Sequence, residues 1–139
     1  MESTDEKYID DISIPNESKL FRRIHPKWWA SDPKEISGKK LSRQAFEDSK
    51  DKSPMSVHLG IVMDAESITP KDILGNYYDM GYSMASITAG FARNLGQGII
   101  RDPTDEDITH GGVFGNKTDS IRRKFAQSAI IEILPKFYH

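Results

Sequence analysis

The first apolar run along the chain is short and stands among basic side chains. Residues 20–24 read Leu-Phe-Arg-Arg-Ile, and Pro26 with the tryptophan pair Trp28 and Trp29 ends the run. A short apolar run bounded by proline is typical of a β-strand. The pattern therefore predicts a strand over 20–24, and the proline and glycine that follow predict a loop over 31–38.

A second strand is predicted over 55–63, where apolar residues alternate with Ser56 and His58 in the first half. An alternation with a period of two residues places the apolar side chains on one face of a strand, and this face packs against the core. Ahead of this strand, residues 42–46 have the pattern of a short turn or helical piece. Residues 47–52 form a charged connector that we expect to be exposed.

Two helices are predicted after this strand. Thr69, Pro70 and Asp72 supply a hydroxyl cap, a proline at the first helical position and a carboxylate in the first turn. We expect this helix to end at Gly81. Apolar residues then recur at helical spacing, which predicts a second helix that ends at the glycines of 96–98; these residues are Met84, Ile87, Ala89 and Phe91.

The last third of the chain predicts two strands and a helix. Residues 98–101 form a short apolar run, and 110–114 are the expected partner strand across an acidic loop. An amphipathic stripe from Ile121 to Ile130 predicts the final helix, with basic residues on its far side. The mixed order of strands and helices favours an α+β fold over a regularly alternating one.

The chain is long enough for one domain. Its 139 residues fit one core, which we assign to a single α+β domain over 19–139, with a short, mainly antiparallel or mixed sheet and about three helices. Residues 1–18 are acidic and contain few apolar side chains, so we expect a flexible, disordered arm. The alternative is that Tyr8 and three isoleucines anchor this arm on a partner or on the domain itself.

Composition limits the classes of function. Basic and acidic side chains number 19 and 21, so the net charge of -2 provides no overall field for nucleic acid or an anionic membrane. The chain has no cysteine, which excludes disulfides, thiolate metal sites and cysteine nucleophiles. The acidic N-terminus and the lack of an apolar run of about 18 residues lead us to expect a cytoplasmic protein that does not enter a membrane.

A glycine-rich run at 111–118 comes close to the phosphate-binding loop of nucleoside triphosphatases. Lys117 and Thr118 stand where that loop has its lysine and hydroxyl, but Asn116 replaces the second glycine. The preceding acidic residues read as a loop and not as a buried strand, so we exclude this class of enzyme. An anion site at the start of the last helix is left open, as is a plain turn with Thr118 as helix cap.

His110 is the candidate acid or base. Its neighbours include the carboxylates of 102–107, which can orient the imidazole ring. A hydrogen-bonding loop residue is the alternative. We expect no metal site and no cofactor, because the calcium-loop pattern is missing and the histidines lack metal-ligand spacing.

Residues 22–29 combine cations with two indoles. Arg22, Arg23, His25, Trp28 and Trp29 can hold phosphate or carboxylate and can stack on a base, although the tryptophans can equally belong to the core. Two further arginines flank the glycines of 96–98 and would extend the patch if they converged with it; these are Arg93 and Arg101.

Two functions agree with these features. The first is a small interaction or accessory module of a larger system, which binds a protein partner or an anionic ligand through the basic and aromatic residues. The second is an enzyme acting on nucleotide or nucleic acid, by ADP-ribosyl transfer or phosphoester cleavage, with an arginine phosphate clamp and His110 as acid or base. A nucleotide or another phosphate is the expected small ligand in both cases.

Overall fold

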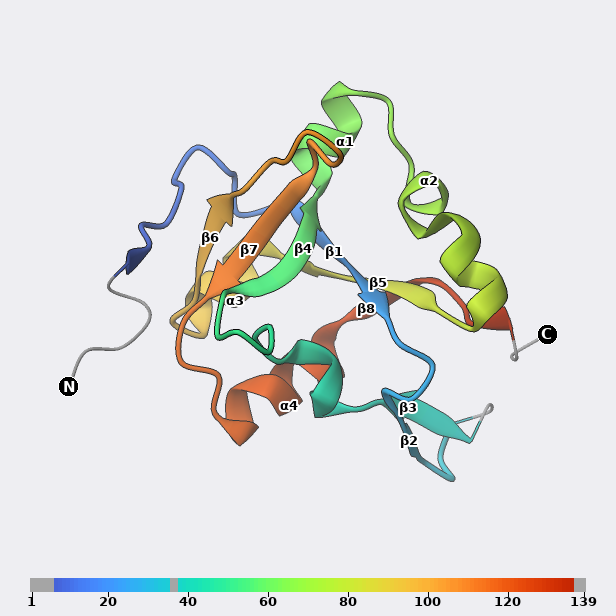
Figure 1. Cartoon of the computed structure of the whole chain (residues 1–139). Coiled ribbons are helices and arrows are strands. Elements are labelled where there is room, and N and C mark those ends of the chain that lie inside the picture. The colour runs from blue at the N-terminus through green and yellow to red at the C-terminus, as the bar shows by residue number, and fades with distance from the viewer. Residues whose placement is uncertain (1–6, 36–37, 137–139) are drawn as a thin grey trace.

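A six-stranded antiparallel sheet organises the chain (Figure 1). The computed structural model describes residues 7–35 and 38–136, and these form one α+β domain, as the sequence predicts. The strand order is β6-β7-β4-β1-β5-β8. The bounds are β1 Lys19–Ile24, β4 Met55–Leu59, β5 Ser83–Thr88, β6 Gly98–Arg101, β7 His110–Phe114 and β8 Ile130–Ile133.

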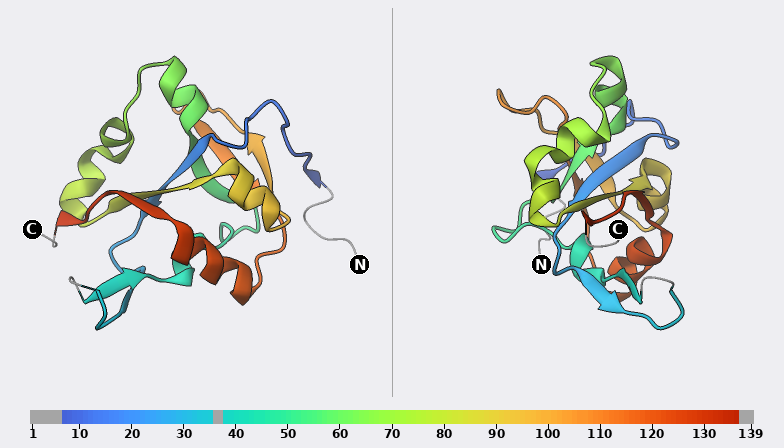
Figure 2. Two further views of the ribbon diagram at one scale, coloured as in Figure 1. Left: turned by 180° about the vertical axis from the view of Figure 1, so that it is seen from behind. Right: turned by 90° about the vertical axis from the view of Figure 1, so that its right-hand side faces the viewer.

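The main core lies on one face of this sheet. It is covered by the α-helices α3 and α4 and by the 3-10 helix η2, and the hairpin of β2 and β3 lies at its edge (Figures 1 and 2). The rings of Phe46 and Phe91 pack on Phe125 of α4 at centroid distances of 5.7 and 5.9 Å. The bounds are α3 Ala89–Asn94, α4 Asp119–Ser128, η2 Arg43–Phe46, β2 Trp29–Ser31 and β3 Lys39–Leu41.

The opposite face is covered over only part of its width. The helices α1, α2 and the 3-10 helix η3 lie on this side (Figure 2, right), and a smaller cluster of Phe21, Met63, Leu74 and Met84 is buried beneath them. Their bounds are α1 Gly60–Ala65, α2 Pro70–Leu74 and η3 Gly75–Met80. The part of this face over β4 and β7 presents polar side chains, among them Ser56, His58 and His110.

Several predicted elements are confirmed. The strands predicted over 20–24, 98–101 and 110–114 are β1, β6 and β7, and the last two pair across the acidic loop. The predicted helix start at Thr69 is a complete capping box: its hydroxyl accepts from the backbone N–H of Asp72, whose carboxylate accepts from the N–H of Thr69.

Other predicted elements are wrong in type or length. Residues 83–88 form the strand β5 and not a helix, and the helix α3 begins only at Ala89. Strand β5 lies between β1 and β8, and its residues from Ser83 to Ile87 are all buried, so no polar alternation marks it. The strand predicted over 55–63 ends at Leu59, and the final helix ends before β8.

The described part of the acidic N-terminal segment, residues 7–18, lies against the domain. Ile14 is fully buried in the main core, and the ring of Tyr8 lies 5.6 Å from that of Phe114. The carboxylate of Asp10 accepts a hydrogen bond from the backbone N–H of Ile99 in β6. The first part of the predicted arm, residues 1–6, lies outside the described residues.

Candidate active site

The sheet register brings four polar side chains onto one face. His58 of β4 lies opposite His110 of β7 on one side and opposite Phe21 of β1 on the other. Because side chains alternate along a strand, Ser56 and Arg23 share that face with the two histidines. The loop 102–109, which joins β6 to β7, rises on the same side as α2 and η3 (Figure 2, right).

The loop fixes the orientation of His58. The Nδ1 atom of His58 lies 3.0 Å from Thr109 Oγ1 and 3.2 Å from Asp107 Oδ2. The hydroxyl of Thr109 donates its own proton to Asp107 at 2.5 Å, so both neighbours of Nδ1 are acceptors and Nδ1 carries the proton. The neutral ring therefore has its lone pair on Nε2, and this atom has no hydrogen-bond partner within the part of the chain that the structure describes.

Burial keeps His58 neutral. Loss of hydration lowers the pKa of His58 to about 4, against the opposing effect of the Asp107 carboxylate. Burial raises the pKa of Asp107, but the hydrogen bonds from Thr109 and the nearby histidines outweigh this effect and leave that pKa below its usual value. At neutral pH the pair is thus an ionised carboxylate that holds a neutral imidazole.

His110 is fixed in the same way by Asp102. Its Nδ1 lies 2.9 Å from the backbone oxygen of Asp102 and 3.2 Å from the carboxylate. A carbonyl oxygen only accepts, so Nδ1 carries a proton, and Nε2 lies 3.1 Å from the Ser56 hydroxyl. The centroids of the two histidine rings are 6.5 Å apart. Two oriented imidazoles thus stand side by side.

Arg23 is the available cation of this face. Its guanidinium carbon lies 4.2 Å from the centroid of the Tyr77 ring, and among the described residues no acceptor receives a hydrogen bond from it. Its neighbour Arg22 points to the other face, where it donates to the backbone oxygens of Ala45 and Ser56. Burial lowers the pKa of Arg22 to about 10, so it remains charged at neutral pH. Arg22 is tied to the backbone, whereas the donors of Arg23 remain available to a ligand.

A pocket of about 340 Å³ lies beside Arg23 and His58, and His110 is not among its lining residues. It lies between α2 and the loop 102–109, and both Arg23 and His58 line it. The remaining lining residues are Ile68, Asp72, Ile73, Glu106, Asp107, Ile108 and Thr109. This volume is at the lower end of the range for small-molecule sites, about 300–1,000 Å³. The pocket therefore has room for a small molecule.

The other residues of the predicted basic and aromatic surface lie elsewhere. The ring of His25 stands between those of Trp28 and Tyr82, at centroid distances of 5.7 and 5.1 Å. Trp28 and Trp29 are half-buried and pack against the main core. The structure therefore separates these two tryptophans from the pocket that contains Arg23.

Arg93 and Arg101 bind the N-terminal segment. Arg93 pairs with Asp10 at 3.0 Å and donates to Asn16, and Arg101 pairs with Asp11 at 3.0 Å. The structure does not bring these two arginines together with Arg23 or His110. The positive charge of each arginine is paired with a carboxylate of the N-terminal segment.

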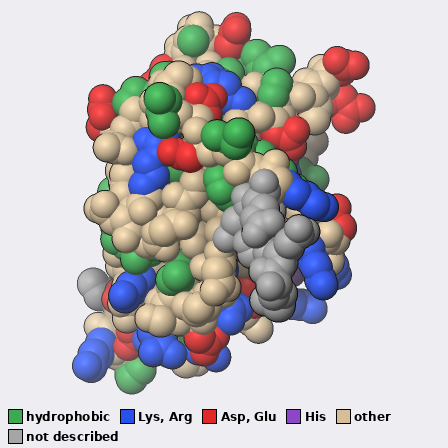
Figure 3. All heavy atoms as spheres, turned by 90° about the vertical axis from the view of Figure 1, so that its left-hand side faces the viewer, with side chains coloured by type: hydrophobic (Ala, Val, Ile, Leu, Met, Phe, Trp, Pro, Cys, Tyr) green, Lys and Arg blue, Asp and Glu red, His purple; other side chains and the backbone are tan. Residues whose placement is uncertain are grey.

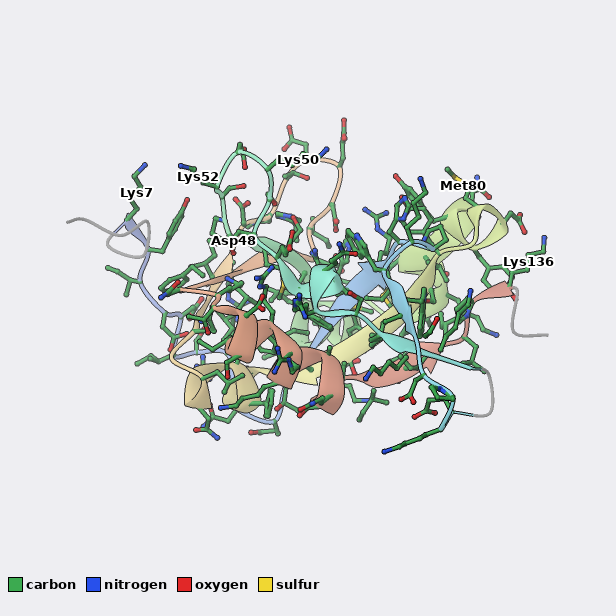
Figure 4. The ribbon with its side chains drawn as sticks, turned by 90° about the horizontal axis from the view of Figure 1, so that it is seen from below. Lys7, Asp48, Lys50, Lys52, Met80 and Lys136 are labelled. Carbon is green, nitrogen blue, oxygen red and sulfur yellow. The ribbon has the colours of Figure 1, made fainter. Side chains whose placement is uncertain are left out.

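Lys117 and Thr118 support the start of α4. The ammonium group of Lys117 lies 2.6 Å from Asp48 and donates to the backbone oxygen of Val113, and only 4% of its side chain is exposed. Asp48 lies at the base of the loop that carries Lys50 and Lys52 (Figure 4). The hydroxyl of Thr118 caps α4. The glycine-rich run thus comprises the end of strand β7 and the turn that leads into α4. The ion pair of Lys117 with Asp48 holds this turn in place.

Sequence reasoning selected Arg23 and His110 but not Ser56 or His58. The signal for these two was present in the alternation over 55–59, which places both on the face away from the core. Which residue lies opposite His58 depends on the pairing of β4 with β7. That register was the missing information.

Comparisons with known proteins returned no relative: no protein family, curated protein or solved structure matches this chain. Across residues 7–35 and 38–136, no group of three or more His, Cys, Asp or Glu side chains is placed to hold a metal ion. None of the helices in these ranges has the length and apolar character needed to cross a membrane.

Proposed function

We propose that this chain is an enzyme that cleaves the phosphodiester bond of a small ribonucleotide by acid–base catalysis. The observation that supports this is the pair of histidines, His58 and His110, each held at Nδ1 by an acidic residue of the loop 102–109. Their ring centroids are 6.5 Å apart. The rings are therefore close neighbours, and we propose that both reach oxygens of one bound phosphate through hydrogen bonds of about 2.7–3.2 Å.

The reaction needs only groups that the site and the substrate supply. Nε2 of His58 removes the proton of the ribose 2′-hydroxyl, and the resulting oxygen attacks the adjacent phosphorus. The bond from phosphorus to the 5′-oxygen breaks, and His110 in its protonated form donates the Nε2 proton to that leaving oxygen. The products are a 2′,3′-cyclic phosphate and a free 5′-hydroxyl. Asp102 pairs with the protonated ring of His110.

Arg23 is the proposed phosphate clamp. A guanidinium presents a planar fork of donors that matches two phosphate oxygens, and it stabilises the charge that grows on them in the transition state. The half-buried position of Arg23 beside His58 favours such a role, because electrostatic attraction is stronger away from bulk water.

The charge around the pocket favours a short substrate. One arginine matches one phosphate, while Asp72 and Glu106 also line the pocket. The net charge is -2, and basic and acidic side chains are interspersed over the face shown in Figure 3. A long polyanion would meet repulsion from these carboxylates, whereas a dinucleotide presents a single charge.

The test is turnover of diribonucleoside monophosphates, with chromatography of the products. The wild type is expected to form a 2′,3′-cyclic phosphate and to leave the matching deoxyribose compounds intact. Replacement of either histidine, as His58→Asn or His110→Asn, is expected to lower kcat by about 10²-fold to 10⁴-fold. Asp105→Asn is the control and should retain wild-type kcat, because Asp105 is an exposed carboxylate of the same loop that pairs with neither histidine. Absence of product from every ribonucleotide tested, or full activity of His58→Asn, would reject the proposal.

A second candidate function is a protein-binding module. A groove of about 590 Å³ between the β2–β3 hairpin and α4 is lined by Trp29 together with Lys40, Arg43 and Arg123. The four basic residues of the lining outnumber its two carboxylates, Asp32 and Glu35, which supports binding of an acidic segment of a partner protein. The double change Lys40→Glu and Arg123→Glu is expected to abolish capture of the partners that the wild type retains. Retention of the same partners at the same strength would reject this candidate.

A further inference from the structure

Tyr77 is an exposed aromatic residue next to the pocket. It belongs to η3, and 39% of the residue is exposed. The guanidinium of Arg23 lies over its ring at 4.2 Å, and the same arginine lines the pocket beside His58. Arg23 therefore connects the Tyr77 ring to the proposed catalytic groups.

The position of Tyr77 is fixed by its neighbours. The ring of Tyr82 meets it in an edge-on arrangement with centroids 5.0 Å apart. The backbone N–H of Tyr82 donates to the backbone carbonyl oxygen of Tyr77 at 3.1 Å. This hydrogen bond joins η3 to the residue that precedes strand β5. Tyr82 in turn packs on His25 at 5.1 Å. A ring that packs on two neighbours and belongs to a partly exposed residue is already ordered, so a ligand that contacts it loses little by ordering it.

Arg23 can serve two parts of one nucleotide. Its guanidinium carbon lies over the Tyr77 ring, while its N–H groups have no acceptor among the described residues. A phosphate bound at that edge brings the attached nucleoside toward the exposed tyrosine. Aromatic rings and arginine planes are common stacking surfaces for unpaired bases.

We propose that Tyr77 and Arg23 form a nucleobase subsite, so that the substrate is recognised by an unpaired base as well as by its phosphate. This rests on the proposed function, because the subsite lies beside the phosphate clamp of that reaction. Stacking on an aromatic side chain accepts any base, so the subsite selects single-stranded ribonucleotides without demanding one sequence.

The test is binding of a dinucleotide that cannot be cleaved because both ribose 2′-oxygens are methylated. Its Kd is measured by titration calorimetry with wild type, Tyr77→Phe and Tyr77→Ala. Removal of the ring is expected to raise Kd by about 5-fold to 150-fold, whereas Tyr77→Phe stays within about 2-fold of wild type. Met80→Ala is the matched control: Met80 is 64% exposed on the same 3-10 helix and lies at its outer end (Figure 4).

A second ligand tests whether the Tyr77 ring stacks on a base or only holds the side chain of Arg23 in place. This ligand is the same dinucleotide with both bases removed. The wild type is expected to bind it as weakly as Tyr77→Ala binds the complete compound, and Tyr77→Ala should weaken its binding no further. If Tyr77→Ala leaves the Kd of the complete dinucleotide unchanged, or weakens both ligands equally, the base subsite is rejected.

The two proposals fail in different ways. A wild type that binds the methylated dinucleotide with the expected dependence on Tyr77, but cleaves no ribonucleotide, supports the subsite and rejects the catalytic function. A wild type that cleaves ribonucleotides with no dependence on Tyr77 supports the catalysis and rejects the subsite. Absence of any dinucleotide binding rejects both.

Discussion

The buried, neutral state of His58 gives the folded protein a pH dependence that a single substitution isolates. Burial holds the pKa of this histidine at about 4, below its ordinary value of 6.5. Between these values the unfolded chain binds a proton that the folded chain does not, so stability falls as pH decreases through this window. His58→Asn removes the titrating group and retains an N–H donor for Asp107 and Thr109.

The size of the effect follows from the two pKa values. His58 is only 8% exposed, so solvent screening reduces the effect little. Proton linkage gives a loss of about 2 kcal/mol from the free energy of unfolding when the pH falls from about 7.5 to about 5, and about 3 kcal/mol in all near pH 4. The lowered pKa of Asp107 acts only below its usual value of 3.8 and so lies outside this window.

The assay is urea unfolding followed by tryptophan fluorescence at both pH values for the wild type and His58→Asn. The wild type is expected to lose about 2 kcal/mol more than the variant on acidification, with equal m-values. Other titrating groups cancel in this difference. If both proteins lose the same stability between the two pH values, then His58 is not a neutral buried group and the assignment of its Nε2 lone pair is wrong.

Three further predictions concern stability and use the same assay. Lys117→Met leaves Asp48 without its cation and is expected to cost about 3 kcal/mol; a loss below about 1 kcal/mol would contradict a buried ion pair. Gly98→Ala would place a Cβ atom 2.2 Å from the Phe114 ring, so a loss of about 2 kcal/mol or more is expected, and wild-type stability would show that the ring moves freely. Thr69→Ala removes the cap of α2 and should cost about 1 kcal/mol, an expectation that an unchanged unfolding midpoint would refute.

The sequence predicted correctly those elements that a few adjacent residues determine. The cap at Thr69, the strand at 20–24 and the start of α4 each depend on a few adjacent residues, and each is present. Strand β5 was wrongly predicted as part of a helix. Both of its faces are buried, so its sequence lacks the alternation of apolar and polar residues that distinguishes a strand from a helix. Strand β8 follows α4 after one residue, and its apolar residues extended the helical pattern.

The candidate site depends on contacts that join distant parts of the chain. Arg23 and His110 were recognisable as chemical groups, but their placement near His58 follows from the pairing of β1 and β7 with β4. Positive charge alone did not identify ligand-binding residues. Arg93 and Lys117 were candidates, but they are paired with Asp10 and Asp48. A sequence shows which cations exist, whereas only the fold shows which have partners.

The contact between the N-terminal segment and β6 bears on how copies of this protein can associate. Both backbone groups of Ile99 are occupied by this segment, through the Asp10 carboxylate and the Asp11 N–H. A sheet that is open at both edges can add copies without limit, whereas a sheet closed at one edge can pair only once. With β6 covered at Ile99, β8 is the edge strand of this sheet that is left for strand-to-strand pairing among the described residues. The acidic segment therefore blocks one of the two sheet edges through which copies of the chain would otherwise pair.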